Sequence, residues 1–148
     1  MSKPLRAYII AGESSGDKLA SGIIAALKAQ HGSIEFYGIG GPEMQKQGLR
    51  SLFPYQELAL MGFAEIVPKM LHLLSRIGLA VEDITNKNPD ILITVDSPGF
   101  NFRVVKKLRE QQFQTKYIHA VAPTVWAYKP ERAKKCAKLF DHMLVLLP

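Results

Sequence analysis

The sequence lacks several features that would narrow its function at once. Its 148 residues include one cysteine, Cys136, and one tryptophan. A single cysteine cannot form an internal disulfide, and no cationic stretch followed by an apolar run opens the chain, so the sequence favours a reducing cytosol. Because no run of about 18 apolar residues is present, we expect no membrane-spanning helix, while attachment to a membrane surface stays open.

Nucleotide-binding fingerprints and the usual metal motifs are also missing. The loop after the first predicted strand, Gly12-Glu13-Ser14-Ser15-Gly16-Asp17, matches neither GxGxxG nor GxxxxGK[ST]. The sequence has no cluster of cysteine and histidine and no DxD motif, so neither a metal nor another cofactor is indicated. The formal charge of +6 permits an anionic partner, such as a lipid phosphate, a nucleotide or nucleic acid, without selecting one.

What is present is the composition of one globular domain. With 47% hydrophobic and 22% charged residues, a chain of this length can bury a sizeable core. Apolar runs predict strands, and apolar residues at helical spacing predict helices between them. The predicted strands cover residues 6–11, 34–38, 91–95, 115–121 and 142–147, with a further short strand at 50–53. The predicted helices cover residues 18–30, 43–47, 79–86 and about 102–113, followed by a basic helix that begins at Pro130.

This alternation predicts an α/β fold with a doubly wound, mostly parallel, Rossmann-like sheet and helices on both faces. In the common strand order 3-2-1-4-5-6, the first strand lies beside the strand at 91–95, and a crevice opens between their carboxyl ends. We therefore expect residues from distant parts of the sequence to meet at one edge of the sheet. These residues are Glu13, Ser14, Ser15 and Asp96, with Trp126 on the rim.

Asp96 is the strongest candidate for chemistry. It directly follows the apolar strand at 91–95, and a carboxylate at this edge of the sheet can act as a general base. The residues Asp-Ser-Pro-Gly are equally ordinary turn residues, so a purely structural aspartate is an even alternative.

The other candidate positions also have two interpretations. Ser14, Ser15 and Glu13 either bind an anion or sugar hydroxyls at the start of a helix or only cap that helix. Trp126 either stacks on a sugar ring or packs against the sheet. Asn101 is the predicted N-cap of the helix that begins near Phe102. The Gly38-x-Gly40-Gly41 cluster predicts a tight turn and no chemistry.

The segment from Leu58 to Leu79 is more apolar than one helix face requires. Three interpretations stay open for it: a buried helix, a contact with another chain or domain, and an acyl-chain or bilayer site flanked by basic residues. Pro68 within the segment predicts a break or kink.

Five blocks of the sequence together resemble the lipid-A-disaccharide synthase family. They occur in order along the whole chain, and their combination is far more specific than any one of them. The blocks are Ala11-Gly12-Glu13-Ser14-Ser15-Gly16-Asp17, Gly40-Gly41-Pro42-x-Met44, Leu58-Ala59-Leu60-Met61-Gly62-Phe63-Ala64-Glu65-Ile66, Asp96-Ser97-Pro98-Gly99-Phe100-Asn101 and Pro123-Thr124-Val125-Trp126-Ala127-Tyr128.

The resemblance implies a bacterial inverting glycosyltransferase of the two-domain GT-B type. Such an enzyme joins UDP-2,3-diacylglucosamine to 2,3-diacylglucosamine 1-phosphate, releasing UDP and forming the β(1→6) disaccharide of lipid A. Asp96 is then the implied catalytic base, and Glu13, Ser14, Ser15, Met61, Asn101 and Trp126 are the implied substrate-binding residues. Phe63, Ile66, Val67, Met70 and Leu74 are the implied lipid or membrane contacts.

The resemblance also implies a partner domain. Residues 1–148 correspond to the N-terminal, acceptor-side domain, and we expect a C-terminal UDP-sugar-binding domain outside this chain, without which this part alone is inactive. The implied partners are the two lipid substrates and the cytoplasmic face of the inner membrane, and no nucleic acid. Two alternatives stay open: another GT-B transferase acting on a lipid-linked sugar, and a non-catalytic α/β module that binds a nucleotide or a protein.

Overall fold

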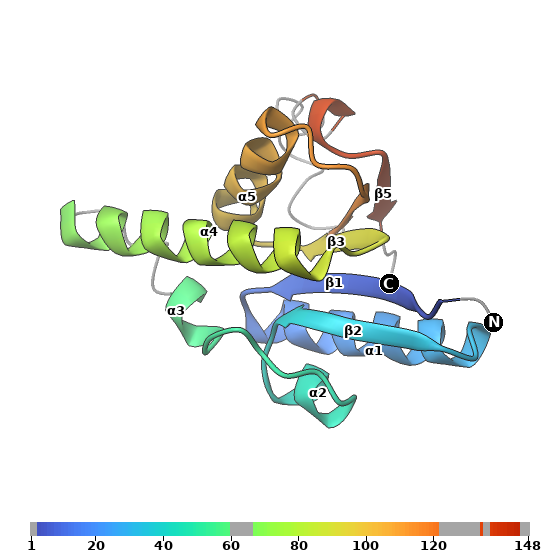
Figure 1. Ribbon diagram of the computed structural model, residues 1–148. Coiled ribbons are helices and arrows are strands. Elements are labelled where there is room, and N and C mark those ends of the chain that lie inside the picture. Colours follow the sequence, from blue (N-terminus) through green and yellow to red (C-terminus); the bar gives the residue numbers. More distant parts are fainter. Residues whose placement is uncertain (1–2, 60–66, 122–133, 135–136, 146–148) are drawn as a thin grey trace.

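A computed structural model describes residues 3–59, 67–121, 134 and 137–145 of the chain. Its centre is a parallel sheet of five strands in the order β2-β1-β3-β4-β5 (Figure 1). The strands are β1 (Leu5–Ala11), β2 (Ile34–Ile39), β3 (Ile91–Val95), β4 (Lys116–Val121) and β5 (His142–Val145). The runs predicted as strands at 6–11, 34–38, 91–95, 115–121 and 142–147 each overlap one of these strands.

Helices cover both faces of the sheet, which confirms the predicted α/β, doubly wound, Rossmann-like fold. Helix α1 (Ser14–Gln30) lies on one face with the short α2 (Pro42–Lys46) beside it, and α4 (Val67–Lys87) and α5 (Pro98–Glu110) lie on the other (Figure 1). The one-turn helix α3 (Gln56–Ala59) precedes α4. Residues 134 and 137–139 are also helical, within the predicted basic helix.

The strand alternation divides the core into two layers. Tyr8 of β1 and Leu92 of β3 point toward α4 and α5, whereas Ile9 and Ile93 point toward α1. Residues 92–95 of β3 are all buried, as expected for a central parallel strand covered on both faces.

Residues 50–53 do not form the predicted strand, although they lie beside β2 as predicted. The segment makes one isolated parallel bridge, between Gly38 of β2 and Ser51. The Ser51 hydroxyl donates to the carbonyl of Phe53 at 2.6 Å and accepts from the amide of Gly40 at 3.0 Å, so local turn bonds replace a continuing ladder. The segment still occupies the third place of the predicted 3-2-1-4-5-6 order.

Two helix starts also differ from prediction. Helix α1 begins at Ser14 rather than at Lys18, so Ser14 and Ser15 belong to its first turn. Pro68 was expected to break or kink a helix, but it is the second residue of α4. Proline is tolerated there because the amides of the first turn have no intrahelical partner in any helix.

The Gly38-x-Gly40-Gly41 cluster was predicted to form a tight turn, but Gly38 and Ile39 are the last residues of β2, and Gly40 and Gly41 connect that strand to α2. Gly38 has φ of 154°, and a Cβ atom there would lie 1.8 Å from the Ile9 carbonyl oxygen. A side chain at this position would therefore collide with the backbone of β1.

Candidate functional site

The loops that follow β1 and β3 meet at the carboxyl edge of the sheet. Ala11 pairs with Val95 at the ends of the two strands. A Cβ atom on Gly12 would lie 2.8 Å from the Ser97 Oγ, and one on Gly16 would lie 3.5 Å from the Val95 Cγ1. The two junctions, more than 80 residues apart in the sequence, are thus in direct contact, as the predicted strand order requires.

Asp96 stands in a strained turn at this edge. It is half-buried and has φ of 49°, and Ser97 after it has φ of 42°. Left-handed conformations at residues other than glycine cost about 1–3 kcal/mol each and are concentrated at functional sites. The Asp96 amide donates to the Ala120 carbonyl at 3.0 Å, which anchors the turn to β4.

Asn101 holds the turn through hydrogen bonds to its backbone. The prediction that Asn101 is the N-cap of the following helix is wrong. The N-cap of α5 is Ser97, and Asn101 lies in the first turn of the helix, fully buried. Its Nδ2 donates to the Asp96 carbonyl at 2.9 Å and to the Val95 carbonyl at 3.4 Å. Its Oδ1 is buried with no hydrogen-bond partner among the described residues. Asn101 therefore acts on the Asp96 backbone, and direct contact with a substrate stays a prediction.

The acidic and serine residues of the first loop have exposed side chains at the same edge. Glu13 is the N-cap residue of α1, but its side chain makes no capping hydrogen bond. Ser14 and Ser15 are exposed in the first turn. The Glu13 side chain therefore does not cap the helix. Binding of an anion or of sugar hydroxyls by these three residues stays a prediction.

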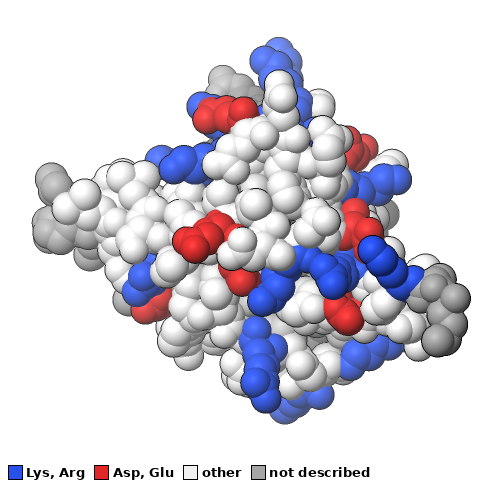
Figure 2. All heavy atoms as spheres, in the orientation of Figure 1, with Lys and Arg blue, Asp and Glu red and all other residues white. Residues whose placement is uncertain are grey.

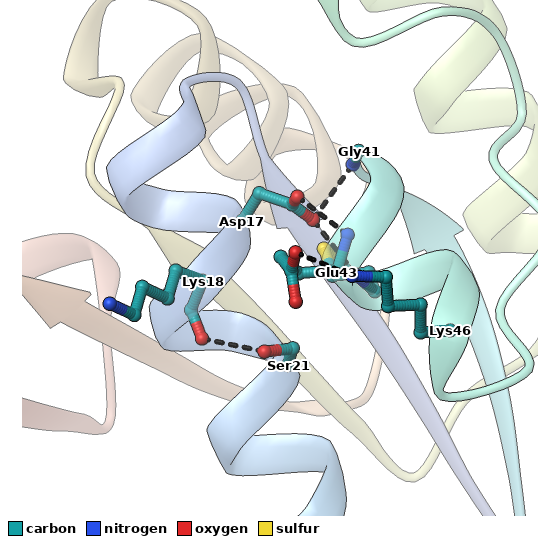
Figure 3. Close-up of polar contacts among 7 residues, drawn as sticks. Asp17, Lys18, Ser21, Gly41, Glu43 and Lys46 are labelled. Atoms are coloured by element: carbon teal, nitrogen blue, oxygen red, sulfur yellow. Dashed lines mark hydrogen bonds and ion pairs between the residues drawn. The ribbon is translucent and has the colours of Figure 1, made fainter.

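Asp17 has a structural role that the sequence analysis did not identify. It is only 2% exposed, and both carboxylate oxygens accept hydrogen bonds from the start of α2 (Figure 3). Its Oδ1 accepts from the amides of Gly41 at 2.9 Å and Met44 at 3.0 Å, and its Oδ2 accepts from the amide of Glu43 at 2.9 Å. The carboxylate caps a helix 24 or more residues away, so no local pattern could have indicated it.

Close packing at Gly41 makes this connection specific. A Cβ atom there would lie 2.7 Å from the Asp17 Oδ2 and 2.8 Å from the Tyr55 ring. Asp17 and Gly41 come from two of the blocks that carry the resemblance, and here both have a structural role.

A buried pair, Thr94 and His119, lies inside the sheet behind the edge. The Thr94 hydroxyl and the His119 Nδ1 are 2.6 Å apart, and the imidazole stacks on Phe140 at 4.9 Å between ring centroids. Burial lowers the pKa of His119 to about 4, so the ring is neutral near pH 7. Sequence reasoning did not single out either residue.

Comparison with known proteins gives the family. The family model described as lipid-A-disaccharide synthetase matches residues 7–148. The chain belongs to this family.

Relatives within the family agree with the resemblance stated above. The chain is 48% identical over 147 residues to the lipid-A-disaccharide synthase of Rhodospirillum centenum, covering 99% of this chain and 37% of that protein. It is 50% identical over 144 residues to the enzyme of the same name from Rickettsia akari, covering 97% of this chain and 37% of that protein. The chain thus spans little more than a third of the length of these relatives.

Solved structures of other proteins support the fold. A UDP-N-acetylglucosamine 2-epimerase has a TM-score of 0.62 at 15% identity, with 96% of this chain and 42% of that chain covered. A second protein of that description, from Listeria monocytogenes, has a TM-score of 0.57 at 16% identity, with 96% and 39% covered. At such low identity these likenesses show the fold alone.

The apolar segment of this family member divides between core and surface. On α4, Leu73 and Ile77 are buried, whereas Met70 is 42% exposed and Leu74 is 48% exposed. The N-terminal end of α4 projects from the sheet beside α3, and that part of the surface is largely free of charged side chains (Figures 1 and 2). The Arg76 Nε lies 2.6 Å from the Glu57 Oε2, which fastens α3 to α4. The buried-helix interpretation therefore holds for Leu73 and Ile77, whereas a surface contact through Met70 and Leu74 stays a prediction.

Several predicted site residues cannot be placed. Met61, Phe63, Ile66 and Trp126 lie outside the described residues, as does the side chain of Val67. Within the described part of the chain, no cluster of three or more potential ligands could hold a metal ion. No described helix combines the length and apolarity needed to cross a bilayer.

Proposed function

We propose that this chain is the acceptor-side domain of a lipid-A-disaccharide synthase. The observation that carries the proposal is the convergence of the Asp96 turn and the Glu13–Ser15 loop at one sheet edge, in a member of this family. The proposed reaction transfers diacylglucosamine from its UDP derivative to diacylglucosamine 1-phosphate with inversion at the anomeric carbon. A second domain, outside this chain, binds the UDP-sugar.

Asp96 is the proposed general base. As the acceptor 6-hydroxyl attacks the anomeric carbon of the donor, its proton passes to the Asp96 carboxylate, the new carbon–oxygen bond forms, and UDP leaves with the electrons of the broken bond. Such a base must come within about 2.6–3.2 Å of the hydroxyl and contributes roughly 10²–10⁴ in rate. The strained turn and the Asn101 bond to its carbonyl hold Asp96 in place for this role.

The remaining edge residues bind the acceptor in this proposal. Glu13 accepts hydrogen bonds from sugar hydroxyls, Ser14 and Ser15 accept from them or donate to them, and Trp126 stacks on a ring. Asn101 acts through the Asp96 backbone. Exposed Met70 and Leu74, with Met61, Phe63, Ile66 and Val67, contact acyl chains or the cytoplasmic surface of the inner membrane, to which the protein binds peripherally.

The test uses the full-length protein that contains this chain, with both lipid substrates. Asp96→Asn should lower kcat at least about a hundredfold, because the amide cannot accept the proton, while the melting temperature changes little. Asp90→Asn is the matched control, since Asp90 lies at the opposite end of β3, where it accepts a bond from the Arg6 amide at 2.8 Å. That control should keep turnover near that of the unaltered enzyme.

Two results would count against the proposal. Near-normal turnover of Asp96→Asn rejects this residue as the base. Absence of disaccharide product from the unaltered enzyme, in the presence of both substrates, rejects the transferase activity and favours a binding module.

A further inference from the structure

A groove with basic walls runs along one side of α5. Its helical wall consists of residues at positions i, i+3, i+4 and i+7, which form a single stripe on the helix surface. The opposite wall comes from the helical residues 137–139. Its volume of about 810 Å³ is within the usual range for small-molecule sites. We call it the α5 groove, and it is lined by Gly99, Phe102, Arg103, Lys106, Lys138 and Leu139.

The α5 groove concentrates positive charge, with no counter-charge among its described lining residues. Arg103, Lys106 and Lys138 are exposed, and none of them forms an ion pair with any residue that the structure describes. No acidic side chain is among its described lining residues. Arg109, on the same helix but outside the groove, is instead paired with Asp141 at 3.3 Å. The three cations therefore favour an anion in the space between them.

The floor of the groove is apolar and firmly supported. Phe102 is half-buried and packs against His119 and Phe140, with ring centroids 5.2 and 5.7 Å apart. Leu139 packs against the core on the same side. A groove that combines this floor with basic walls suits an anion attached to a carbohydrate or acyl body rather than a free inorganic ion.

The groove begins next to the proposed base. Pro98, which also lines it, is two residues beyond Asp96, so their Cα atoms lie within about 8 Å of each other. The helical rise then places Arg103 about 8 Å and Lys106 about 12 Å along α5 from Pro98. A phosphate on the side of a sugar ring remote from Asp96 falls within this stretch.

We propose that the α5 groove binds the phosphate monoester of the phosphorylated glycolipid acceptor. This inference rests on the proposed function and adds a subsite to it. Arg103 and Lys106 bind the phosphate, which carries a charge of about −1.5 to −2 near pH 7, and Phe102 supports the attached sugar or acyl portion. The groove thereby selects a phosphorylated acceptor over a neutral one.

The test compares two double variants of the full-length protein with equal loss of charge. Arg103→Gln with Lys106→Gln removes cations from the groove. Lys107→Gln with Lys116→Gln removes exposed cations outside it. The probes are glucosamine 1-phosphate, inorganic phosphate and N-acetylglucosamine, with binding measured by calorimetry or ligand-observed NMR.

The groove variant should weaken glucosamine 1-phosphate binding about tenfold or more, because it loses charge-assisted hydrogen bonds, while the control variant binds as the unaltered protein does. The KM for the phosphorylated acceptor should rise by a similar factor, with the KM for the UDP-sugar unchanged. Affinity for glucosamine 1-phosphate should also fall with added salt, since exposed charges are screened.

Three results would overturn the inference. The first is that both double variants bind glucosamine 1-phosphate equally well. The second is that the unaltered protein binds inorganic phosphate as tightly as glucosamine 1-phosphate. The third is that it binds N-acetylglucosamine as tightly as glucosamine 1-phosphate. The binding measurement does not need turnover. If the unaltered enzyme forms no disaccharide, the transferase proposal fails while the groove is still tested separately.

Discussion

Two aspartates of this chain, Asp17 and Asp96, lie in contrasting regions. Asp17 is in a sealed region, the α1–α2 junction, where it is 2% exposed and both its oxygens accept bonds from backbone amides. Asp96 is in an open region, the carboxyl edge of β1 and β3, where it is half-buried in a left-handed turn. Both belong to blocks typical of the family, so family membership alone does not separate their roles.

The difference shows how burial distinguishes a structural carboxylate from a candidate catalytic one. In the sealed region the Asp17 carboxylate has no remaining access for a substrate, because its neighbours are α2 amides and a close-packed glycine. In the open region Asp96 stands in a strained turn, and Glu13, Ser14 and Ser15 are exposed at the same edge of the sheet. Substitutions in the sealed region should therefore lower the free energy of unfolding, and substitutions in the open region should lower the activity.

Of the substitutions at the two aspartates, Asp17→Ala should have the larger effect on stability. This substitution leaves the amides of Gly41, Glu43 and Met44 without their acceptor, and each buried unsatisfied group costs about 1–3 kcal/mol. The free energy of unfolding should fall by about 3–5 kcal/mol, as measured by urea denaturation. A loss as small as that of Asp96→Asn would erase the contrast between the two regions.

His119 tests whether the interior behind the open edge is sealed. Its pKa of about 4 in the folded state is below the ordinary value of 6.5, so the unfolded chain binds the extra proton first. Stability from this group is full above pH 6.5 and falls as the pH drops toward 4, by about 3 kcal/mol in total.

The measurement is the pH dependence of unfolding for the unaltered protein and for His119→Gln, which removes the titrating group. The control is His142→Gln, at an exposed position, whose curve should match that of the unaltered protein. A pH dependence unaffected by His119→Gln would mean that water reaches the interior from the edge.

The apolar surface of α4 should tolerate charge where it is open. Met70→Asp with Leu74→Asp should reduce binding of the full-length protein to anionic vesicles by about tenfold, because two exposed apolar side chains leave the proposed lipid contact. The far-ultraviolet spectrum should persist. Leu73→Asp is the contrasting variant, and it should unfold the protein because Leu73 is 8% exposed. Unfolding of the first variant would instead assign Met70 and Leu74 to the core.

The smallest expected effects come from two glycines. Gly22→Ala should stabilise α1 by about 0.5–1 kcal/mol, since nothing lies within 4 Å of the added Cβ. Gly41→Ala should destabilise, because its Cβ would meet the Asp17 Oδ2 at 2.7 Å. Thermal denaturation would measure both, and tolerance of alanine at Gly41 would contradict the tight packing of the sealed region.

Much of the fold could be predicted because its signals are local. Apolar runs at 6–11 and 91–95 are strands, and apolar spacing in 18–30 is part of α1. The errors lie where tertiary contacts override local pattern. Residues 50–53 form one bridge instead of a strand, and Asn101 is buried within a helix instead of capping it.

The candidate site divides in the same way. The alternation of elements was enough to predict that Asp96 and the Glu13–Ser15 loop share an edge, because right-handed crossovers leave few possible strand orders. The capping of α2 by Asp17 depends on backbone amides 24 or more residues away. The neutral state of His119 depends on its burial among residues from distant parts of the chain.

The amino-acid sequence by itself determined the strands, the helices, their parallel order and the family to which the chain belongs. Only the tertiary structure decided which aspartate is sealed, which side of α4 is open, and that three cations face one groove beside Asp96. The physical reason is that periodicity and chirality act between near neighbours, whereas burial and charge pairing depend on which distant residues occupy the same space.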